Sequence, residues 1–235
     1  MAIAYLYRSL NVIDLLFDVN SSLVITMDKL IRKRRGGPRT FDRNEAVNTA
    51  MHLFWRHGYE GVSLNDLTSA IGIAPPSLYA AFGSKAGLYR ETLDRYFGMQ
   101  GALTDLEVAT NLPQAAETML RNAVKAVTSP EGERGCMVSS GMLQSAADHS
   151  ELARELTTRR DDMRNAISVT LLRWTDKARA ETLARYLVTV LQGLSVQARD
   201  GATRDELHQV VDQVIAGVRA TLAPQPAVEN AVGRH

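Results

Sequence analysis

The chain has 235 residues, of which 45% are hydrophobic and 23% charged, as in a globular protein with a sizeable core. Its single cysteine, Cys136, excludes an internal disulfide, and no stretch approaches the roughly 20 apolar residues of a membrane span. The formal net charge of +1 does not by itself indicate nucleic acid as a partner. We expect a cytoplasmic protein without a membrane partner.

Residues 1–26 allow two interpretations. Their apolar side chains recur at helical spacing, at positions Leu6, Leu10, Ile13 and Phe17. This spacing predicts a short amphipathic helix. Alternatively, the protein starts at Met27 and the preceding residues are not translated, which is the interpretation we favour.

Positive charge is concentrated just after this segment. Seven basic residues lie in one short stretch: Lys29, Arg32, Lys33, Arg34, Arg35, Arg39 and Arg43. Only Asp28 and Asp42 oppose them there. On its own the pattern is also typical of a solvated tail, so the role of this N-terminal extension, residues 1–39, depends on the kind of domain to which it is attached.

The next part of the chain predicts four helices. Apolar residues recur three and four positions apart, and Gly58, Gly72 and Gly83 interrupt the pattern. The expected helices cover residues 41–57, 63–71, 75–82 and 84–97. We expect these helices to form one compact domain over residues 40–98.

The rest of the sequence predicts a second helical domain over residues 99–222. Its expected helices cover residues 114–127, 136–147 and 150 to about 176, followed by two regular amphipathic helices. The apolar stripes of these last two contain Leu183, Leu187, Val190 and Leu194, and then Leu207, Val211, Val214 and Val218. Between them, Thr203 and Glu206 stand at capping-box spacing, so we expect a helical hairpin. The tail, residues 223–235, loses the periodicity and is expected to be disordered. The predicted fold class is all-α.

The second and third helices have the pattern of a helix-turn-helix, because a short glycine-containing turn joins them. The residues expected to pack inward are Leu64, Leu67, Ile71, Ile73, Leu78 and Phe82. The residues left facing outward are Pro75, Pro76, Ser77, Tyr79 and Ala80. A short exposed helix of this kind fits the major groove of DNA.

Three further residues suit an anion such as a DNA phosphate. Ser63 and Ser84 each stand at the start of a helix, where free N–H groups and the helix dipole favour negative charge. Lys85 adds a positive charge beside Ser84. Taken one at a time, these features are also those of an ordinary helical hairpin.

Taken together, residues 44–88 resemble the DNA-binding domain of the tetracycline-repressor (TetR) family of bacterial regulators. The resemblance is carried by Ala50, Phe54, Gly58, Tyr59, Ser63, Leu67, Ala70, Gly72, Ile73, Ala74, Ser77, Leu78, Tyr79, Phe82, Ser84, Lys85 and Leu88. By position, it implies phosphate contacts for Ser63, Tyr79 and Lys85. It also implies a base-reading surface between Ala74 and Ala80.

The base-reading surface departs from the family pattern. Pro75 and Pro76 stand where members often carry a small or basic residue, and the surface has almost no long hydrogen-bond donors. We therefore expect base recognition to rest on Ser77, on apolar contact with thymine methyl groups and on DNA shape.

Beside such a domain, the basic stretch gains a DNA-binding role. Flexible arginines ahead of a first helix can enter the adjacent minor groove, where narrowing concentrates negative potential. We assign this contact to Arg34, Arg35 and Arg39. The expected partner is a double-stranded, pseudopalindromic DNA operator.

The resemblance implies that the second domain binds a small-molecule effector and forms a homodimer. Small residues on the last two helices, such as Gly193 and Gly217, independently favour close approach of two subunits. The residues assigned to the dimer interface are Leu187, Leu194, Val211 and Val214. The candidates for the effector site are Met119, Met142, Met163 and Trp174, although such residues more often belong to a core. Cys136 is either a thiolate sensor or a small core residue, and we favour the core.

No nucleophile motif, glycine-rich phosphate loop or metal-ligand spacing is present in the sequence, so we expect neither an enzyme nor a cofactor. We interpret the chain as a homodimeric, ligand-responsive transcriptional regulator. That it represses rather than activates rests on the resemblance alone. The alternative is an all-helical small-molecule-binding protein without DNA-regulatory activity, which the donor-poor third helix suggests.

Overall fold

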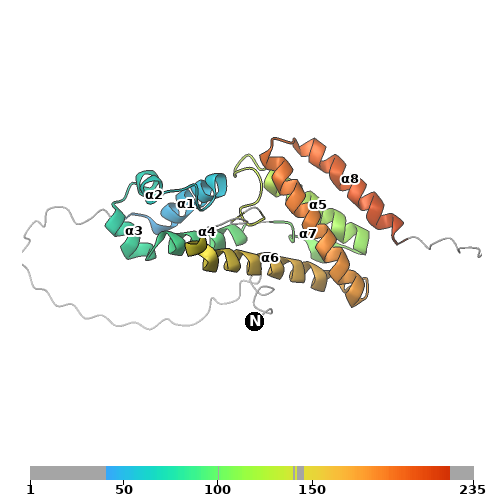
Figure 1. Cartoon of the computed structure of the whole chain (residues 1–235). Coiled ribbons are helices and arrows are strands. Elements are labelled where there is room, and N and C mark those ends of the chain that lie inside the picture. The colour runs from blue at the N-terminus through green and yellow to red at the C-terminus, as the bar shows by residue number, and fades with distance from the viewer. Residues whose placement is uncertain (1–40, 100, 140, 142–145, 223–235) are drawn as a thin grey trace, which may run out of the picture. The chain divides into compact units, whose positions relative to one another are not determined.

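The computed structural model describes residues 41–99, 101–139, 141 and 146–222, and within them it contains helices and no strand (Figure 1). The α-helices are α1 (Arg43–His57), α2 (Leu64–Ile71), α3 (Pro75–Phe82), α4 (Lys85–Phe97), α5 (Leu112–Val127), α6 (Ser150–Leu171), α7 (Lys177–Arg199) and α8 (Arg204–Ala220). Two 3-10 segments, η2 (Leu106–Val108) and η3 (Ala147–His149), precede α5 and α6. The predicted all-α fold class is confirmed.

Reciprocal side-chain caps fix the starts of α2 and α8. Ser63 Oγ accepts a hydrogen bond from the backbone N–H of Asp66 (3.1 Å), and the Asp66 carboxylate accepts one from the backbone N–H of Ser63 (2.8 Å). Thr203 and Glu206 form the same pair at α8. Each cap stabilises its helix by about 0.5–2 kcal/mol. The Thr203–Glu206 capping pair predicted from the sequence is confirmed.

The buried apolar residues form two clusters. One cluster draws its residues from α1 to α4, from Met137 and Val138, and from Leu152 and Leu156 at the start of α6. The other draws them from α5, α7 and α8 and from the second half of α6. α6 therefore contributes to both cores and connects them, whereas the domain boundary placed after residue 98 stays a prediction.

The expectation of a helix over residues 136–147 is wrong for its first described residues, whereas residues 140 and 142–145 lie outside the described part of the chain. Residues 137–139 and 141 form turns, and Cys136 is not helical. Their backbone groups find partners far away in the sequence: Cys136 donates its N–H to Ser195 Oγ (2.8 Å), and Arg160 donates to the carbonyl of Val138 (3.1 Å). Side chains of α6 and α7 thus satisfy polar groups that a helix would otherwise pair.

The division between α6 and α7 also differs from the expectation. α6 ends at Leu171 rather than near Asp176. Asp176 instead caps α7, since its carboxylate accepts a hydrogen bond from the N–H of Arg179 (3.0 Å). An aspartate between two periodic stretches fits the start of the second helix better than the end of the first.

Candidate nucleic-acid interface

A tight turn connects α2 to α3. Gly72 lies in the left-handed region, with φ 76° and ψ 33°, and donates its N–H to the carbonyl of Thr68 (2.9 Å). The N–H of Ile73 bonds to the same carbonyl (3.0 Å). Because side chains with a Cβ are strained at this φ, glycine suits the position. The turn sets the direction in which α3 leaves α2.

α3 has one buried and one outward face. Leu78 and Phe82 are buried in the core, as the sequence predicts. On the opposite side Pro75, Pro76, Tyr79 and Ala80 are exposed, and Ser77 is half-buried. Tyr79 is the most prominent of these, with 47% of its surface exposed. The outward face is therefore apolar, with one phenol and one hydroxyl.

The start of α3 is a poor anion site. Pro75 and Pro76 occupy its first turn and have no N–H, and the N–H of Ser77 donates to the carbonyl of Ala74 (2.9 Å). No side chain of α3 carries a charge. Polar donors to an anion beside α3 would therefore have to come from the neighbouring helix ends.

Ser63 and Ser84 lie exposed at the starts of α2 and α4. The Ser63 hydroxyl donates to Asp66 Oδ2 (2.7 Å), so its hydrogen is engaged within the cap. Ser84 Oγ accepts a hydrogen bond from the N–H of Gly87 (2.9 Å) and donates to no acceptor in the described part of the chain. Ser84 is thus better prepared than Ser63 to donate to a phosphate.

Lys85 is held at the first position of α4. Its Nζ lies 4.2 Å from the ring centroid of Tyr59, in a cation–π contact. Burial lowers the pKa of Lys85, while the nearby carboxylates of Glu60 and Asp66 act in the opposite direction. The contact holds the ammonium group against the Tyr59 ring, which restricts the long side chain.

Aromatic contacts hold α3 and α4 against α1. Phe54 meets Tyr89 edge to face, with ring centroids 4.9 Å apart, and Tyr89 lies 5.0 Å from Tyr59. Arg43, which the sequence marks only as one of the basic residues, also has a structural role. Its guanidinium lies 4.9 Å from the Phe82 ring centroid and donates to the carbonyl of Ala81 (3.4 Å). The end of α3 is therefore fixed to α1, which keeps its outward face in a defined orientation.

Further DNA contacts are predicted for the basic stretch ahead of α1, here called the basic arm. Arg34, Arg35 and Arg39 lie outside the described residues. Their minor-groove contact stays a prediction.

The three effector candidates in the described part of the chain lie in different surroundings. Met119 is 0% exposed and belongs to the core, and Met163 packs against that core. Trp174 donates its indole N–H to the carbonyl of Thr110 (3.2 Å). Met142 lies outside the described residues. Met119, Met163 and Trp174 are not among the residues that line a recess between α6 and α7.

The four residues predicted for the dimer interface pack inside their own chain. Leu187, Leu194, Val211 and Val214 are 1%, 2%, 0% and 8% exposed. They belong to the core shared by α5, α7 and α8. Their contact with a second subunit stays a prediction, and the outer faces of α7 and α8 carry other residues.

Cys136 lies where the two cores meet. It packs half-buried against both clusters, and its Sγ accepts a hydrogen bond from the N–H of Ser139 (3.4 Å). Burial, with a further contribution from Cys136, raises the pKa of the neighbouring Tyr96 well above its usual value. This placement agrees with the core interpretation, and a sensing role is not tested by it.

Metal-binding and membrane-spanning features are absent from the described part of the chain. Among those residues, no group of three or more histidine, cysteine or carboxylate side chains could hold a metal ion. None of the described helices is long and apolar enough to cross a membrane.

The region from α1 to α4 matches a known protein family. The sequence profile described as "Bacterial regulatory proteins, tetR family" matches residues 46–92. The HTH-type transcriptional repressor ComR of Escherichia coli (strain K12) is 33% identical over 207 residues, covering 83% of this chain and 95% of that protein. The repressor BdcR of the same organism is 32% identical over 174 residues, covering 73% and 86%.

A solved structure extends the similarity to most of the chain. A cysteine-substituted TetR family regulator, CifR, complexed with 26-base-pair double-strand operator DNA, superimposes with a TM-score of 0.72 at 38% identity. The match covers 77% of this chain and 98% of that one. The similarity therefore includes the helices beyond α4 as well as the helix-turn-helix.

Proposed function

Because the chain belongs to the tetR family of bacterial regulatory proteins, we propose that it is a homodimeric repressor that a small-molecule effector releases from a pseudopalindromic operator. As a member, it is a DNA-binding transcription regulator and not an enzyme. The observation that carries the proposal is the exposed face of α3, held by the Gly72 turn and the aromatic core. Its site of action is the bacterial cytoplasm, where the DNA lies.

The outward face of α3 reads the major groove in this proposal. Tyr79, Ser84 and Lys85 contact phosphates on the two sides of the groove, together with the N–H groups at the start of α2 beside Ser63. The half-buried Ser77 hydroxyl reaches a base edge. The CifR complex with operator DNA supports this assignment, since the two chains are 38% identical.

The basic arm adds a second DNA contact. Arg34, Arg35 and Arg39 precede α1 by only a few residues. Arginines tethered this close to a major-groove reader are within reach of the adjacent minor groove. Their contact raises affinity and its dependence on salt more than it raises sequence preference.

Dimerisation involves the outer faces of α7 and α8. Tyr186, Val196 and Val210 are 45%, 46% and 45% exposed in the protomer. A Cβ added at Gly193 or Gly217 would meet nothing within 4 Å, so packing within the protomer does not require glycine at either position. Glycines on an exposed apolar stripe suit the close approach of a second pair of helices around a two-fold axis.

A gel-shift measurement tests the proposal. Purified full-length protein is titrated against the DNA upstream of its own gene and against random DNA of the same length, at low salt. We expect saturable retardation of the upstream DNA at lower protein concentration. Tyr79→Ala should weaken it, whereas Leu172→Ala, which alters an apolar residue of similar exposure (46%) on the other domain, should not. No retardation of either DNA would favour the alternative of a small-molecule-binding protein without DNA-regulatory activity.

A further inference from the structure

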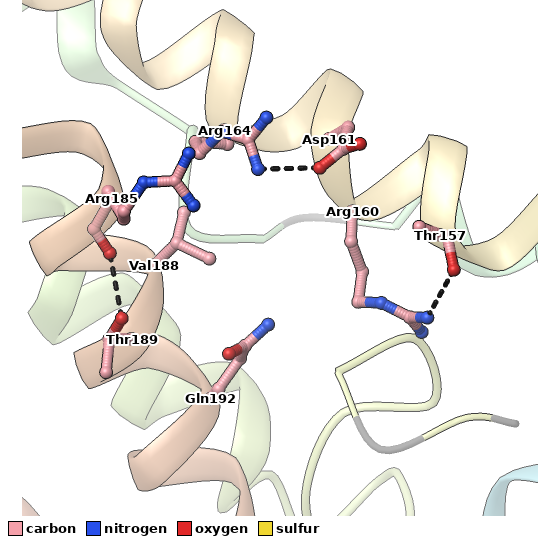
Figure 2. A pocket seen from close by; sticks show the side chains of 8 residues that line it. All are labelled: Thr157, Arg160, Asp161, Arg164, Arg185, Val188, Thr189 and Gln192. Carbon is pink, nitrogen blue, oxygen red and sulfur yellow. Dashed lines mark hydrogen bonds and ion pairs between the residues drawn. The ribbon is translucent and has the colours of Figure 1, made fainter. Parts of the chain in front are cut away.

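A recess of about 160 Å³ lies between α6 and α7 (Figure 2). Its lining residues are Thr157, Arg160, Asp161 and Arg164 from α6, and Arg185, Val188, Thr189 and Gln192 from α7. Figure 2 shows these side chains placed around the open space between the two helices. Drug-sized ligands occupy pockets of about 300–1,000 Å³, so this recess suits a smaller molecule.

The charges around the recess are unbalanced. Arg164 pairs with Asp161, with 2.6 Å between the guanidinium and the carboxylate. Arg160 donates only to neutral acceptors, among them Thr157 Oγ1 (3.1 Å). The Arg185 guanidinium has no hydrogen-bond acceptor or carboxylate partner in the described part of the chain. Three arginines and one aspartate therefore line the recess, an excess of two positive charges.

We propose that this recess binds a small organic dianion of the dicarboxylate type. A guanidinium matches a carboxylate through two parallel N–H···O bonds, and such charge-assisted bonds are stronger than neutral ones. The Gln192 amide and the Thr189 hydroxyl provide neutral polar groups beside them. Two unbalanced guanidinium groups match a ligand with two negative charges, and they disfavour a cation in the same place.

Arg160 also links the recess to the DNA-binding core. Its Nη1 donates to the carbonyls of Val138 (3.1 Å) and Gly141 (3.0 Å). Val138 is 3% exposed and lies in the same cluster as the residues of α1 to α4. An anion that draws the guanidinium toward the recess changes its bonds to these carbonyls. The dianion is then the effector of the proposed repressor, an assignment that rests on the proposed function.

Binding is measured first, without DNA. The full-length protein is titrated by calorimetry with malonate, succinate and glutarate at neutral pH and constant ionic strength. Inorganic phosphate and the uncharged succinamide are measured alongside. We expect saturable binding of at least one dicarboxylate and none of succinamide.

Variants locate the site. Arg185→Gln should weaken dicarboxylate binding about 10- to 100-fold, because it removes a charge-assisted pair, and Arg185→Lys should retain part of the affinity. Arg185 is exposed and makes no structural contact through its guanidinium, so these variants should fold normally. Arg154→Gln changes an exposed arginine of α6 outside the recess and is the matched control.

Each other outcome overturns the proposal. If no dicarboxylate binds, the recess is a solvated arginine surface. If Arg154→Gln weakens binding as much as Arg185→Gln, the attraction is diffuse. If phosphate binds and the dicarboxylates do not, the ligand class is wrong.

A gel-shift with the same preparations separates this inference from the proposed function. The bound dicarboxylate should release the upstream DNA from the wild type but not from Arg185→Gln, which should bind DNA normally in its absence. Dicarboxylate binding by a protein that retards no DNA would reject the proposed function and leave the site intact. DNA binding that a bound dicarboxylate does not alter would reject its role as effector.

Discussion

At the scale of single residues, the proposed DNA interface has separate groups for binding phosphates and for reading bases. The groups best prepared for phosphates lie at helix ends beside α3, with Lys85 held on the Tyr59 ring 4.2 Å away. The groups facing outward from α3 itself are mostly apolar. Affinity and sequence preference should therefore respond to different substitutions.

Lys85→Ala tests the positioning role. It should lower affinity about equally for operator and random DNA, and reduce the slope of log K against log salt by roughly one unit, because one fewer phosphate is neutralised. Fluorescence anisotropy over a salt series measures both quantities. Lys125→Ala, an exposed lysine on α5, is the control and should change neither. A changed sequence preference in Lys85→Ala would mean that α3 is docked in the wrong orientation.

Ser77→Ala tests the reading role. Loss of a base contact should cost roughly 1–3 kcal/mol at one base-pair position per half-site and leave non-specific binding unchanged. On a two-fold dimer the affected position should appear twice, in inverted orientation. A binding profile over every single-base variant of the operator measures this. A uniform loss across all variants would assign Ser77 to the backbone instead.

At the scale of helices and turns, Gly72 determines how α3 is presented. Gly72→Ala should reduce the free energy of unfolding by roughly 1–2 kcal/mol, because a Cβ is unfavourable at φ 76°. Urea denaturation measures the loss. Gly101→Ala is the matched control. A Cβ at Gly101 also meets nothing within 4 Å, but Gly101 is not among the glycines with positive φ. Equal stabilities of the two variants would show that the turn does not need the left-handed conformation.

An ion pair joins α4 to α6. Arg90 donates to both carboxylate oxygens of Glu155, at 2.8 and 2.5 Å, and this bonding holds the pKa of Glu155 below its ordinary value of 4.5. A depressed carboxyl pKa stabilises the fold above the unfolded-state pKa, and the contribution disappears as the pH falls through the folded-state pKa. About a third of each side chain is exposed, so the pair is worth only about 0.5–1 kcal/mol.

Glu155→Gln should therefore be less stable than the wild type by about 0.5–1 kcal/mol at neutral pH, and the difference should vanish in acid, below the pKa of the paired carboxyl. Denaturant titrations at several pH values between neutral and acid follow the difference. Asp162→Asn changes an exposed carboxylate of the same helix and should show no such trend. A difference that persists in acid would have to come from packing.

The helices that the sequence predicted well are those with local signals. Gly72 and the Ser63–Asp66 cap are readable from neighbouring residues, and the structure contains both. The turns after Gly135 were missed because their backbone partners, Ser195 and Arg160, are distant in the sequence. Apolar spacing alone could not reveal them.

The α6–α7 recess was missed for a related reason. Arg160 and Arg164 are spaced four apart, as on any solvated helix face, and only folding places Arg185 on the neighbouring helix beside them. The methionines and Trp174 were attractive candidates because they adapt to ligands. The structure uses Met119 as core and Trp174 as a hydrogen-bond donor to Thr110.

At the scale of the whole chain, the two cores are connected by polar bonds as well as by α6. The Trp55 indole N–H donates to the carbonyl of Gly135 (3.0 Å), and Arg199 at the end of α7 donates to the carbonyl of Trp55 (2.7 Å). A shift of α7 relative to α1 must break or lengthen the bond between Arg199 and Trp55. A ligand between α6 and α7 is therefore placed to alter the orientation of the DNA-binding helices.

The dimer interface is tested by charge on the outer face of α8. Val210 is 45% exposed in the protomer, so Val210→Glu should fold normally, yet between two subunits it would bury an unpaired carboxylate. Leu187→Asp is less informative, because Leu187 is only 1% exposed and the charge would disrupt the protomer's own core.

Light scattering should show a dimer for the wild type and a folded monomer for Val210→Glu, with circular dichroism confirming the helices. Val169→Glu places the same charge on an exposed valine of α6 (63% exposed) and should remain dimeric. The monomer should also bind the operator more weakly, because each half-site is then bound independently and not by two linked subunits. If Val210→Glu and Val196→Glu both remain dimers at micromolar concentration, the subunits meet through a different surface.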